Sequence, residues 1–327
     1  MLSGHGDWVL DAAFTPDGKS VATVDAQGGL LLRDPGANPG STPRPQRLGF
    51  RLLNSVAYDR AGQRIILAGE RIVPTGDTSE ERGRILVADA GTLQQTDELQ
   101  LIDVVTTASL SKGGRWLLAT TDVGSSRLWH MRDGKQRGRS LELPAAWSAA
   151  FSPDGRSIVT TAGDGIVRVL ETATQELRHT HRHPGAAGAA FSPDGKTVVS
   201  FGSDATAQLW DIATGHKRRI LRGHTGFIAS AAFSPDGKRI VTAGADQTTR
   251  VWEVKTGKLL FAQRMHDDYV NRVAFAPDGK NILSASDDRT ARIYPCTTCV
   301  SIDRLLDVAK RRSFFKDDEL KAVVAGR

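Results

Sequence analysis

Three histidines, His179, His181 and His183, occupy alternate positions in one short segment. In a β-strand every second side chain points to the same face, so the three imidazoles would lie side by side. Neutral imidazole is a common ligand of transition metals, and a metal site is the chemistry that this spacing could support. The alternative is that the three histidines have separate structural roles.

Cys296 and Cys299 are the two cysteines of the chain and form a Cys-x-x-Cys pair near its end. Such a pair could bind zinc or exchange between thiol and disulfide. However, no second pair of ligands with suitable spacing stands nearby, and no βαβ pattern of the thioredoxin type surrounds the pair. We therefore expect two reduced thiols and no metal, in a fold that does not rest on a disulfide framework.

The composition of the 327 residues is that of an ordinary soluble globular protein, with 39% hydrophobic and 24% charged residues. No apolar run reaches 18 residues, so no membrane-spanning helix is expected. The first residues lack the basic and apolar regions of a secretory signal, and a cytoplasmic location is the expectation. The net charge of +6 comes from 43 basic residues dispersed among 37 acidic ones, which favours a mixed surface over a nucleic-acid footprint.

The motifs of several enzyme classes are absent from the sequence. It contains no phosphate-binding Gly-x-x-x-x-Gly-Lys-Ser/Thr loop, no His-Glu-x-x-His and no Gly-x-Ser-x-Gly. The glycines belong to turns instead. We therefore expect neither an enzyme nor a bound cofactor.

An internal repeat organises nearly the whole chain. The sequence Phe-Ser-Pro-Asp-Gly occurs three times and has close or weaker copies elsewhere, at intervals of 40 to 52 residues. The first residue of each copy, here called the anchor, is Phe14, Tyr58, Leu110, Phe151, Phe191, Phe233 or Phe275. Seven units with this period fit the blades of a β-propeller, with four short strands in each blade.

The residues of one unit explain why it would form a blade. Proline fixes φ, aspartate bonds its own backbone and glycine accepts positive φ, so Pro-Asp-Gly makes a tight turn. Around one such turn the sequence predicts four strands, at 228–233, 239–242, 249–252 and 258–262. A single sheet of this kind exposes an apolar face, which packing against the next sheet in a ring buries.

These repeats closely resemble the WD40 family over about residues 4 to 295, which implies a seven-bladed WD40 propeller. Three units match the hydrogen-bonded structural tetrad of the family. The corresponding residues are His183, Ser200, Asp204 and Trp210; His224, Thr242, Asp246 and Trp252; and His266, Ser284, Asp288 and Tyr294, in which tyrosine replaces tryptophan.

The other units depart from the family pattern. The first keeps His5 and Thr23, but Gln27 and Arg33 stand where aspartate and tryptophan are expected. The fourth keeps Thr160 and Asp164 and has Leu170 in place of tryptophan, whereas the second and third are degenerate although Trp129 remains.

The resemblance also decides between the readings of the polar residues. A histidine linked to an aspartate and a hydroxyl looks like a catalytic triad, but in this family the group stabilises the blade. Because His183 belongs to a tetrad and the other two histidines fall on an outer strand, we expect no metal site there.

Two segments are predicted to be loops. An insertion from Glu70 to Arg84 accounts for the longest repeat interval and is interpreted as a mobile loop between strands. The segment Pro35 to Pro45 is rich in proline and glycine and is expected between the third and outer strands of the first blade.

The ends of the chain raise the question of how the ring closes. Four residues precede His5, so the N-terminus can supply a stub of the last outer strand. Either the propeller is excised from a longer protein, which we favour, or residues around Thr298 to Ile302 supply the strand. Residues 296–327 are predicted to form a short helical extension packed on the propeller of residues 1–295, with Ser301 as N-cap and an apolar stripe from Ile302.

Candidate binding residues come from positions that WD40 propellers present on their top face. Trp8, Phe227 and Tyr269 lie six residues before an anchor, and Trp147 and Asn271 lie four before. Asp287 and Ser203 precede tetrad aspartates. Large aromatic side chains on an exposed rim are typical anchors for partners. The alternative is that they pack between neighbouring blades.

The sequence therefore predicts a non-catalytic scaffold or sensor module that binds a protein partner through its top face. The C-terminal run from Cys296 resembles the end of WD40 modules in bacterial signalling proteins with STAND-type NTPase or protein-kinase domains, which implies an attached or associated domain of that kind. The alternative is a nucleic-acid-binding propeller that uses a basic face. A hydrolase or lyase with a site in the central channel is a third reading, and the fold alone does not exclude it.

Overall fold

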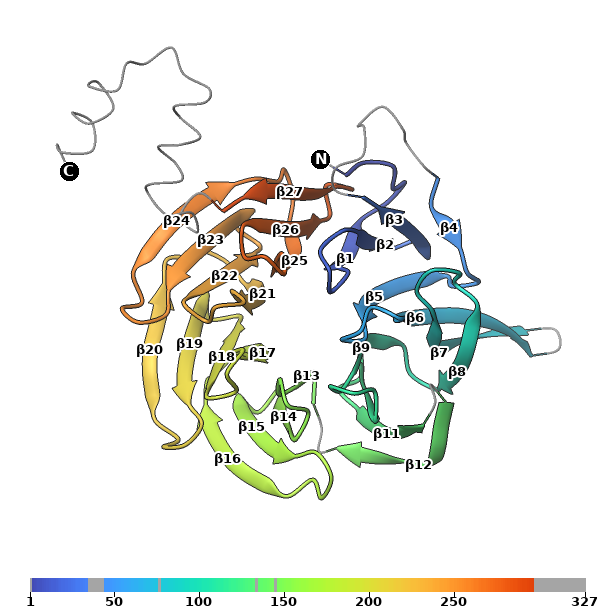
Figure 1. Cartoon of the computed structure of the whole chain (residues 1–327), viewed down its shortest axis with the longest axis horizontal. Helices are drawn as coiled ribbons and strands as arrows, with labels where there is room; N and C mark the ends of the chain where they lie inside the picture. Colours follow the sequence, from blue (N-terminus) through green and yellow to red (C-terminus); the bar gives the residue numbers. More distant parts are fainter. Residues whose placement is uncertain (1, 35–43, 76–77, 133–134, 144–145, 297–327) are drawn as a thin grey trace, which may run out of the picture.

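The computed structural model describes residues 2–34, 44–75, 78–132, 135–143 and 146–296. Seven antiparallel sheets stand around a central channel, and within each sheet the strands follow one another in sequence order (Figure 1). The predicted all-β, seven-bladed propeller is confirmed. The described ranges contain no helix with the length and apolar character that a membrane crossing needs.

Each blade begins with the strand nearest the channel. The innermost strands are β1 (Val9–Phe14), β5 (Leu52–Tyr58), β9 (Val105–Leu110), β13 (Ser148–Phe151), β17 (Ala186–Phe191), β21 (Ile228–Phe233) and β25 (Val270–Phe275). The second strands are β2 (Val21–Asp25), β6 (Arg64–Thr75), β10 (Trp116–Thr121), β14 (Ser157–Thr161), β18 (Thr197–Gly202), β22 (Arg239–Gly244) and β26 (Asn281–Ser286).

The third strands are β3 (Gly29–Arg33), β7 (Thr78–Asp89), β11 (Ser126–Arg132), β15 (Ile166–Glu171), β19 (Thr206–Asp211), β23 (Thr248–Glu253) and β27 (Ala291–Pro295). The outer strands are β4 (Gln46–Arg47), β8 (Gln95–Leu101), β12 (Lys135–Leu143), β16 (Leu177–Arg182), β20 (Lys217–Arg222) and β24 (Leu259–Arg264).

The repeated Pro-Asp-Gly turns join the first and second strands of five blades, and the weaker copies of the motif stand at the same place in the second and third blades. In the sixth blade the Ser234 hydroxyl donates to Asp236 at 2.6 Å, and the same carboxylate accepts the Lys238 amide at 3.0 Å. Gly237 has φ of 69°, in the left-handed region that glycine adopts without strain. We call the end of the channel with these turns the bottom face and the end where the innermost strands begin the top face.

The hydrophobic core lies between blades rather than within them. In one interface, Val199, Phe201 and Leu209 of the fifth blade pack against Ile228 and Trp252 of the sixth. All five side chains are buried. Because each blade buries its apolar face on its neighbour, the ring as a whole is the stable unit.

Within the described residues the seventh blade has three strands, and Leu2 adds a single bridge at the edge of β27. The Leu2 amide donates to the Ala291 carbonyl at 2.7 Å, and the Ala291 amide returns a bond to Leu2 at 3.2 Å. The N-terminal residues thus contribute the short stub that the sequence predicted. The alternative closing segment, Thr298 to Ile302, and the predicted helical tail over 297–327 lie outside the described residues.

The prediction of a mobile loop from Glu70 to Arg84 is wrong. This segment lengthens β6 and β7 into a continuous antiparallel hairpin that pairs as far as Thr75 and Thr78 and extends outward from the ring (Figure 1). Ion pairs at its base favour strand pairing, including Arg84 with Glu98 at 3.1 Å. Most of the other predicted loop, residues 35–43, lies outside the described residues.

The prediction of reduced thiols is also wrong. Cys296 is buried and disulfide-bonded, and the described residues include no free cysteine.

Candidate functional site

The sixth blade contains the complete tetrad that the sequence predicts. His224 Nδ1 lies 2.9 Å from Asp246 Oδ2, and His224 Nε2 lies 2.8 Å from Thr242 Oγ1. The Trp252 indole donates to the same hydroxyl at 2.8 Å. A neutral imidazole that donates to Asp246 accepts from Thr242 at its other nitrogen, so the four side chains form one continuous hydrogen-bonded chain.

The fifth blade has the same partners with the imidazole turned over. His183 Nδ1 contacts Ser200 Oγ at 2.7 Å, Nε2 contacts Asp204 Oδ1 at 3.2 Å, and Trp210 donates to Ser200 at 3.0 Å. The sequence lacks one residue after this histidine relative to the sixth unit. This deletion accompanies the reversed orientation.

The seventh blade has a three-membered version. His266 contacts Asp288 at 2.8 Å and Ser284 at 2.7 Å. Tyr294 occupies the tryptophan position, but its buried hydroxyl lies outside hydrogen-bonding geometry with the described residues. Burial raises the pKa of this hydroxyl to about 12.

The first blade corrects the sequence analysis. His5 contacts Thr23 at 2.7 Å as expected, but the carboxylate at its Nδ1 atom is Asp25, also at 2.7 Å, and not a residue at the position of Gln27. Gln27 is exposed. Arg33, at the tryptophan position, donates to the Ser3 carbonyl at 2.7 Å. Asp25 is the only acidic residue between Thr23 and the third strand, a signal that could have identified it.

The fourth blade keeps only fragments of the network. Thr160 and Leu170 are buried. Asp164 is paired with Arg168 in place of a histidine. Trp129 of the third blade is buried in the core beside Leu117 and Met131.

Burial and hydrogen bonding fix the charge states of the tetrads. Burial lowers the pKa of His224 below its ordinary value of 6.5, although Asp246 opposes the shift. Burial acts upward on Asp246, but hydrogen bonding by Thr248 and the contact with His224 hold its pKa below 3.8. The network at neutral pH is therefore a neutral imidazole beside a carboxylate. Thr242 is completely buried, so its hydroxyl is inaccessible to a substrate.

Trp8, Phe227 and Tyr269 form an arc over three consecutive blades, the sixth, seventh and first. Their side chains are 51%, 41% and 53% exposed. Each backbone carbonyl accepts an amide from the turn after the second strand of its own blade: Ala26 to Trp8, Ala245 to Phe227 and Asp287 to Tyr269, at 2.8 to 3.0 Å. The same backbone bond thus holds all three aromatic residues at the top face.

Trp147 lies on the fourth blade, apart from this arc. A Cβ atom on Gly124 would lie 2.6 Å from its ring, and one on Gly163 would lie 2.7 Å away. The indole therefore lies against two glycines, one in each of two neighbouring blades, while 55% of the side chain remains exposed. Trp147 combines packing between blades with an exposed ring surface.

The polar candidates surround the arc unevenly. Asn271 donates to the Val9 carbonyl at 3.2 Å and to Asp287 at 2.6 Å, so its amide ties the seventh blade to the first. Burial raises the pKa of Asp287, and the neighbouring carboxylates of Asp268 and Asp7 add to the shift. Ser203 is exposed on the fifth blade, away from this group.

The three alternate histidines have separate environments. His183 belongs to the tetrad, whereas His181 is buried and stacks on Trp210 with ring centroids 4.5 Å apart. Burial lowers the pKa of His181. Among the residues that the structure describes, no three histidine, cysteine or acidic side chains gather closely enough to hold a metal ion.

A hollow of about 780 Å³ at the outer edge of the fifth and sixth blades is strongly basic. Glu253 is the one acidic residue among its described lining residues. The cations that line it are Lys217, Arg218, Arg219, Lys238 and Lys255. Sequence analysis did not identify this cluster, because its members come from three different strands and turns.

The chain was compared with known protein families and with curated proteins. The family model described as WD domain, G-beta repeat matches residues 1–32, 141–170, 175–211, 215–253 and 257–294, together more than half of the chain. The unmatched stretch before residue 141 contains the second and third units, whose motifs have drifted. No curated protein matches the chain.

Proposed function

The chain belongs to the WD40 repeat family, and from this membership we propose that it binds a protein partner through the top face of its propeller. WD40 propellers are generally protein-interaction scaffolds without catalytic activity. The observation that carries the proposal is the arc of Trp8, Phe227 and Tyr269 at equivalent positions of three consecutive blades. Exposed aromatic side chains on a rigid backbone bind at low cost in conformational entropy.

The charges around the arc favour a partner segment that carries lysine or arginine. Asp7 accepts the Trp8 amide at 2.8 Å, and Asp268 accepts the Tyr269 amide at the same distance. An aspartate therefore stands directly before two of the aromatic residues, and Asp287 lies close enough to feel both charges. Cations bind well where carboxylates adjoin the faces of aromatic rings.

The finer setting rests on the C-terminal run that begins at Cys296. From its resemblance to the end of WD40 modules in bacterial signalling proteins, we infer a sensor module that regulates an attached or associated NTPase or kinase domain. Binding of a partner at the top face would be the signal that such a domain receives. A cytoplasmic location goes with this role.

Selection from a displayed peptide library tests the top face and its charge preference. We expect the wild-type protein to enrich peptides rich in lysine or arginine, and a Trp8→Ala, Phe227→Ala, Tyr269→Ala variant to lose this enrichment. The control replaces two apolar residues of the outer strands, Leu177 and Leu259, which are 56% and 37% exposed. The control variant should enrich the same peptides as the wild type. Enrichment of acidic peptides by the wild type, or equal enrichment of basic peptides by the wild type and the triple alanine variant, would count against the proposal.

The basic hollow between the fifth and sixth blades supports a second candidate function, the binding of nucleic acid. Five cations border it against a single glutamate. Titration with a labelled oligonucleotide at several salt concentrations tests this function. Affinity that falls steeply with salt and is lost in an Arg219→Glu, Lys255→Glu variant would support it. Weak binding that is unchanged by the two substitutions would exclude it.

A further inference from the structure

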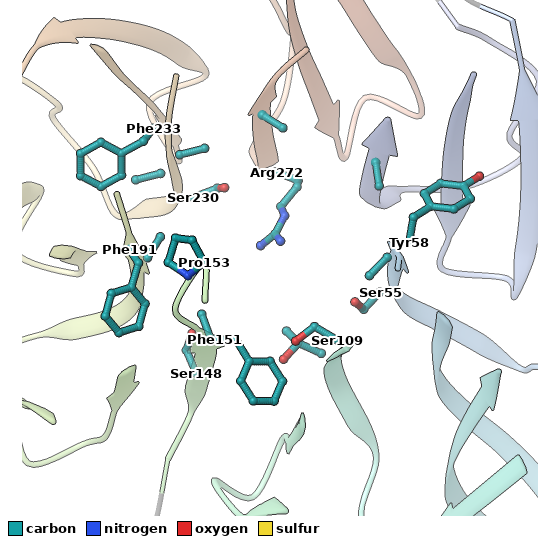
Figure 2. Close-up of a pocket in the computed structure, with 18 of the residues that line it drawn as sticks. Ser55, Tyr58, Ser109, Ser148, Phe151, Pro153, Phe191, Ser230, Phe233 and Arg272 are labelled. Carbon is teal, nitrogen blue, oxygen red and sulfur yellow. The ribbon is translucent and has the colours of Figure 1, made fainter. Parts of the chain in front are cut away.

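The bottom half of the central channel holds a cavity of about 710 Å³ (Figure 2). Its wall consists of the ends of the innermost strands together with prolines and other residues of the turns that follow. It therefore lies at the opposite end of the channel from Trp8, Phe227 and Tyr269. A volume of this size is in the range of pockets that hold small molecules.

Small side chains keep this part of the channel open. The residue immediately before the anchor lines the cavity in every blade, and in six of the seven it is alanine. These residues are Ala13, Ala57, Ser109, Ala150, Ala190, Ala232 and Ala274.

The charged residues of the cavity wall all have one sign. They are Arg60, Lys112 and Arg272, and no aspartate or glutamate occurs among the described lining residues. A concave site with cations alone on a wall of low dielectric constant concentrates positive potential. An anion in the cavity would therefore be attracted, and the positive charge of Arg60 and Lys112 has no acidic neighbour among the described lining residues.

A buried carboxylate orients the innermost of these cations. Arg272 Nε lies 3.2 Å from Asp11 Oδ1, across the contact between the seventh and first blades. Asp11 is 5% exposed and also accepts the backbone amides of Ala12 at 2.8 Å and Val56 at 3.1 Å. Three blades thus converge on one carboxylate, which fixes the near edge of the guanidinium.

The far edge of the Arg272 guanidinium is available for binding. Figure 2 shows the side chain pointing into the open centre of the ring, and half of it is exposed. Within the described part of the chain neither terminal nitrogen takes part in a hydrogen bond, and the ion-pair partner of Arg272 is Asp11 alone. A guanidinium fork with two free donors matches the geometry of a carboxylate or phosphate group.

We propose that this cavity is a binding site for a small molecule that bears an oxyanion, with Arg272 as the bidentate donor. Lys112 and Arg60 add positive charge at the bottom of the channel, and the wall hydroxyls of Ser109 and Ser148 supply further donors. Asp11 is a positioning residue, since it holds the guanidinium without lining the cavity. The site is independent of the top face.

Isothermal titration with three probes tests the site: inorganic phosphate, pyrophosphate and citrate. We expect saturable binding of at least one probe to the wild-type protein and an affinity at least tenfold lower in Arg272→Gln. Binding of the phosphates alone identifies a phosphate ligand, binding of citrate alone a carboxylate ligand, and binding of all three a general oxyanion site. Phosphate and citrate also stabilise proteins in general, without occupying a site. Isothermal titration separates the two effects, because only binding at a site gives a saturable heat.

Two further variants separate binding from folding. Arg60→Ala, Lys112→Ala removes two cations without touching Asp11 and should weaken binding several-fold, even if Arg272→Gln fails to fold. Arg82→Ala removes a partly exposed cation from the distant hairpin and should leave binding unchanged. Absence of saturable binding to the wild-type protein, or equal affinity in the cavity variants and the wild type, would overturn the proposal.

Discussion

The Nδ1 atom of His5 lies 2.7 Å from Oδ2 of Asp25, and both side chains are 1% exposed. In the sixth blade the corresponding aspartate stands four residues after the tetrad hydroxyl, whereas Asp25 stands two residues after Thr23. Asp25 also accepts the amides of Gly29 at 2.7 Å and Gln27 at 3.0 Å. The Asp25 carboxylate thus binds the histidine as Asp246 does in the sixth blade, although it stands two residues earlier in the repeat.

This geometry predicts that Asp25 stabilises the first blade and Gln27 does not. Replacing Asp25 with alanine leaves a buried imidazole and two backbone amides, of which that of Gly29 is buried, without their acceptor; this should lower the free energy of unfolding by about 2–4 kcal/mol. Gln27→Ala should change it by less than about 0.5 kcal/mol, because that side chain is exposed. Urea denaturation measures both, and a larger effect of Gln27→Ala would refute the assignment.

The hairpin of β6 and β7 offers a matched pair of arginines on one face of one strand. Arg84 is 10% exposed, donates to both oxygens of Glu98 and to the Leu48 carbonyl, and covers the ring of Phe50. Arg82 is 36% exposed and contacts Glu80.

We expect Arg84→Ala to lower the free energy of unfolding by about 3 kcal/mol and Arg82→Ala by less than about 0.5 kcal/mol. The first change leaves Glu98 partly uncompensated in a protected site, whereas the second removes a pair that water screens. Denaturation curves of the two variants provide the test. Equal losses of stability would show that the ion pair of Arg84 at the base of the hairpin stabilises the protein no more than the surface pair of Arg82.

The tetrads predict a loss of stability on mild acidification. Burial lowers the pKa of His183, His224 and His266 in the folded protein below the ordinary value of 6.5. As the pH falls below about 6.5 the unfolded chain therefore binds protons that the folded protein does not, and the folded state loses stability. The slope is at most about 1.4 kcal/mol per pH unit for each histidine.

The paired aspartates act in the same direction at lower pH. Despite burial, hydrogen bonds hold the pKa of Asp204, Asp246 and Asp288 below 3.8, so their contribution is lost only as the pH falls below about 4. Melting temperatures at pH 7.5, 6.5, 5.5 and 5 test the histidine window, and His224→Asn should reduce the slope there. A stability that is constant from pH 7.5 to 5 would contradict this account.

Local sequence was sufficient to predict the ring and its blades. The Pro-Asp-Gly turns depend on neighbouring residues alone, as Ser234, Asp236 and Gly237 illustrate. The number of these turns along the chain gives the number of blades. The apolar strands between the turns must pack against neighbouring blades to be buried. The positions of Trp8, Phe227 and Tyr269 followed from the same count, because each stands a fixed number of residues before a turn.

Only the tertiary structure decided which residues meet across blades. Asp25 takes the role expected of the residue at position 27. A hydrogen bond to His5 depends on where the carboxylate oxygen lies in space and not on its position in the sequence repeat. Arg84, the last residue of an insertion that resembled a loop, reaches Glu98 on the neighbouring strand β8. Asp11 and Arg272 are 261 residues apart in the chain and become neighbours when the ring closes, since closure alone brings the first and last blades together.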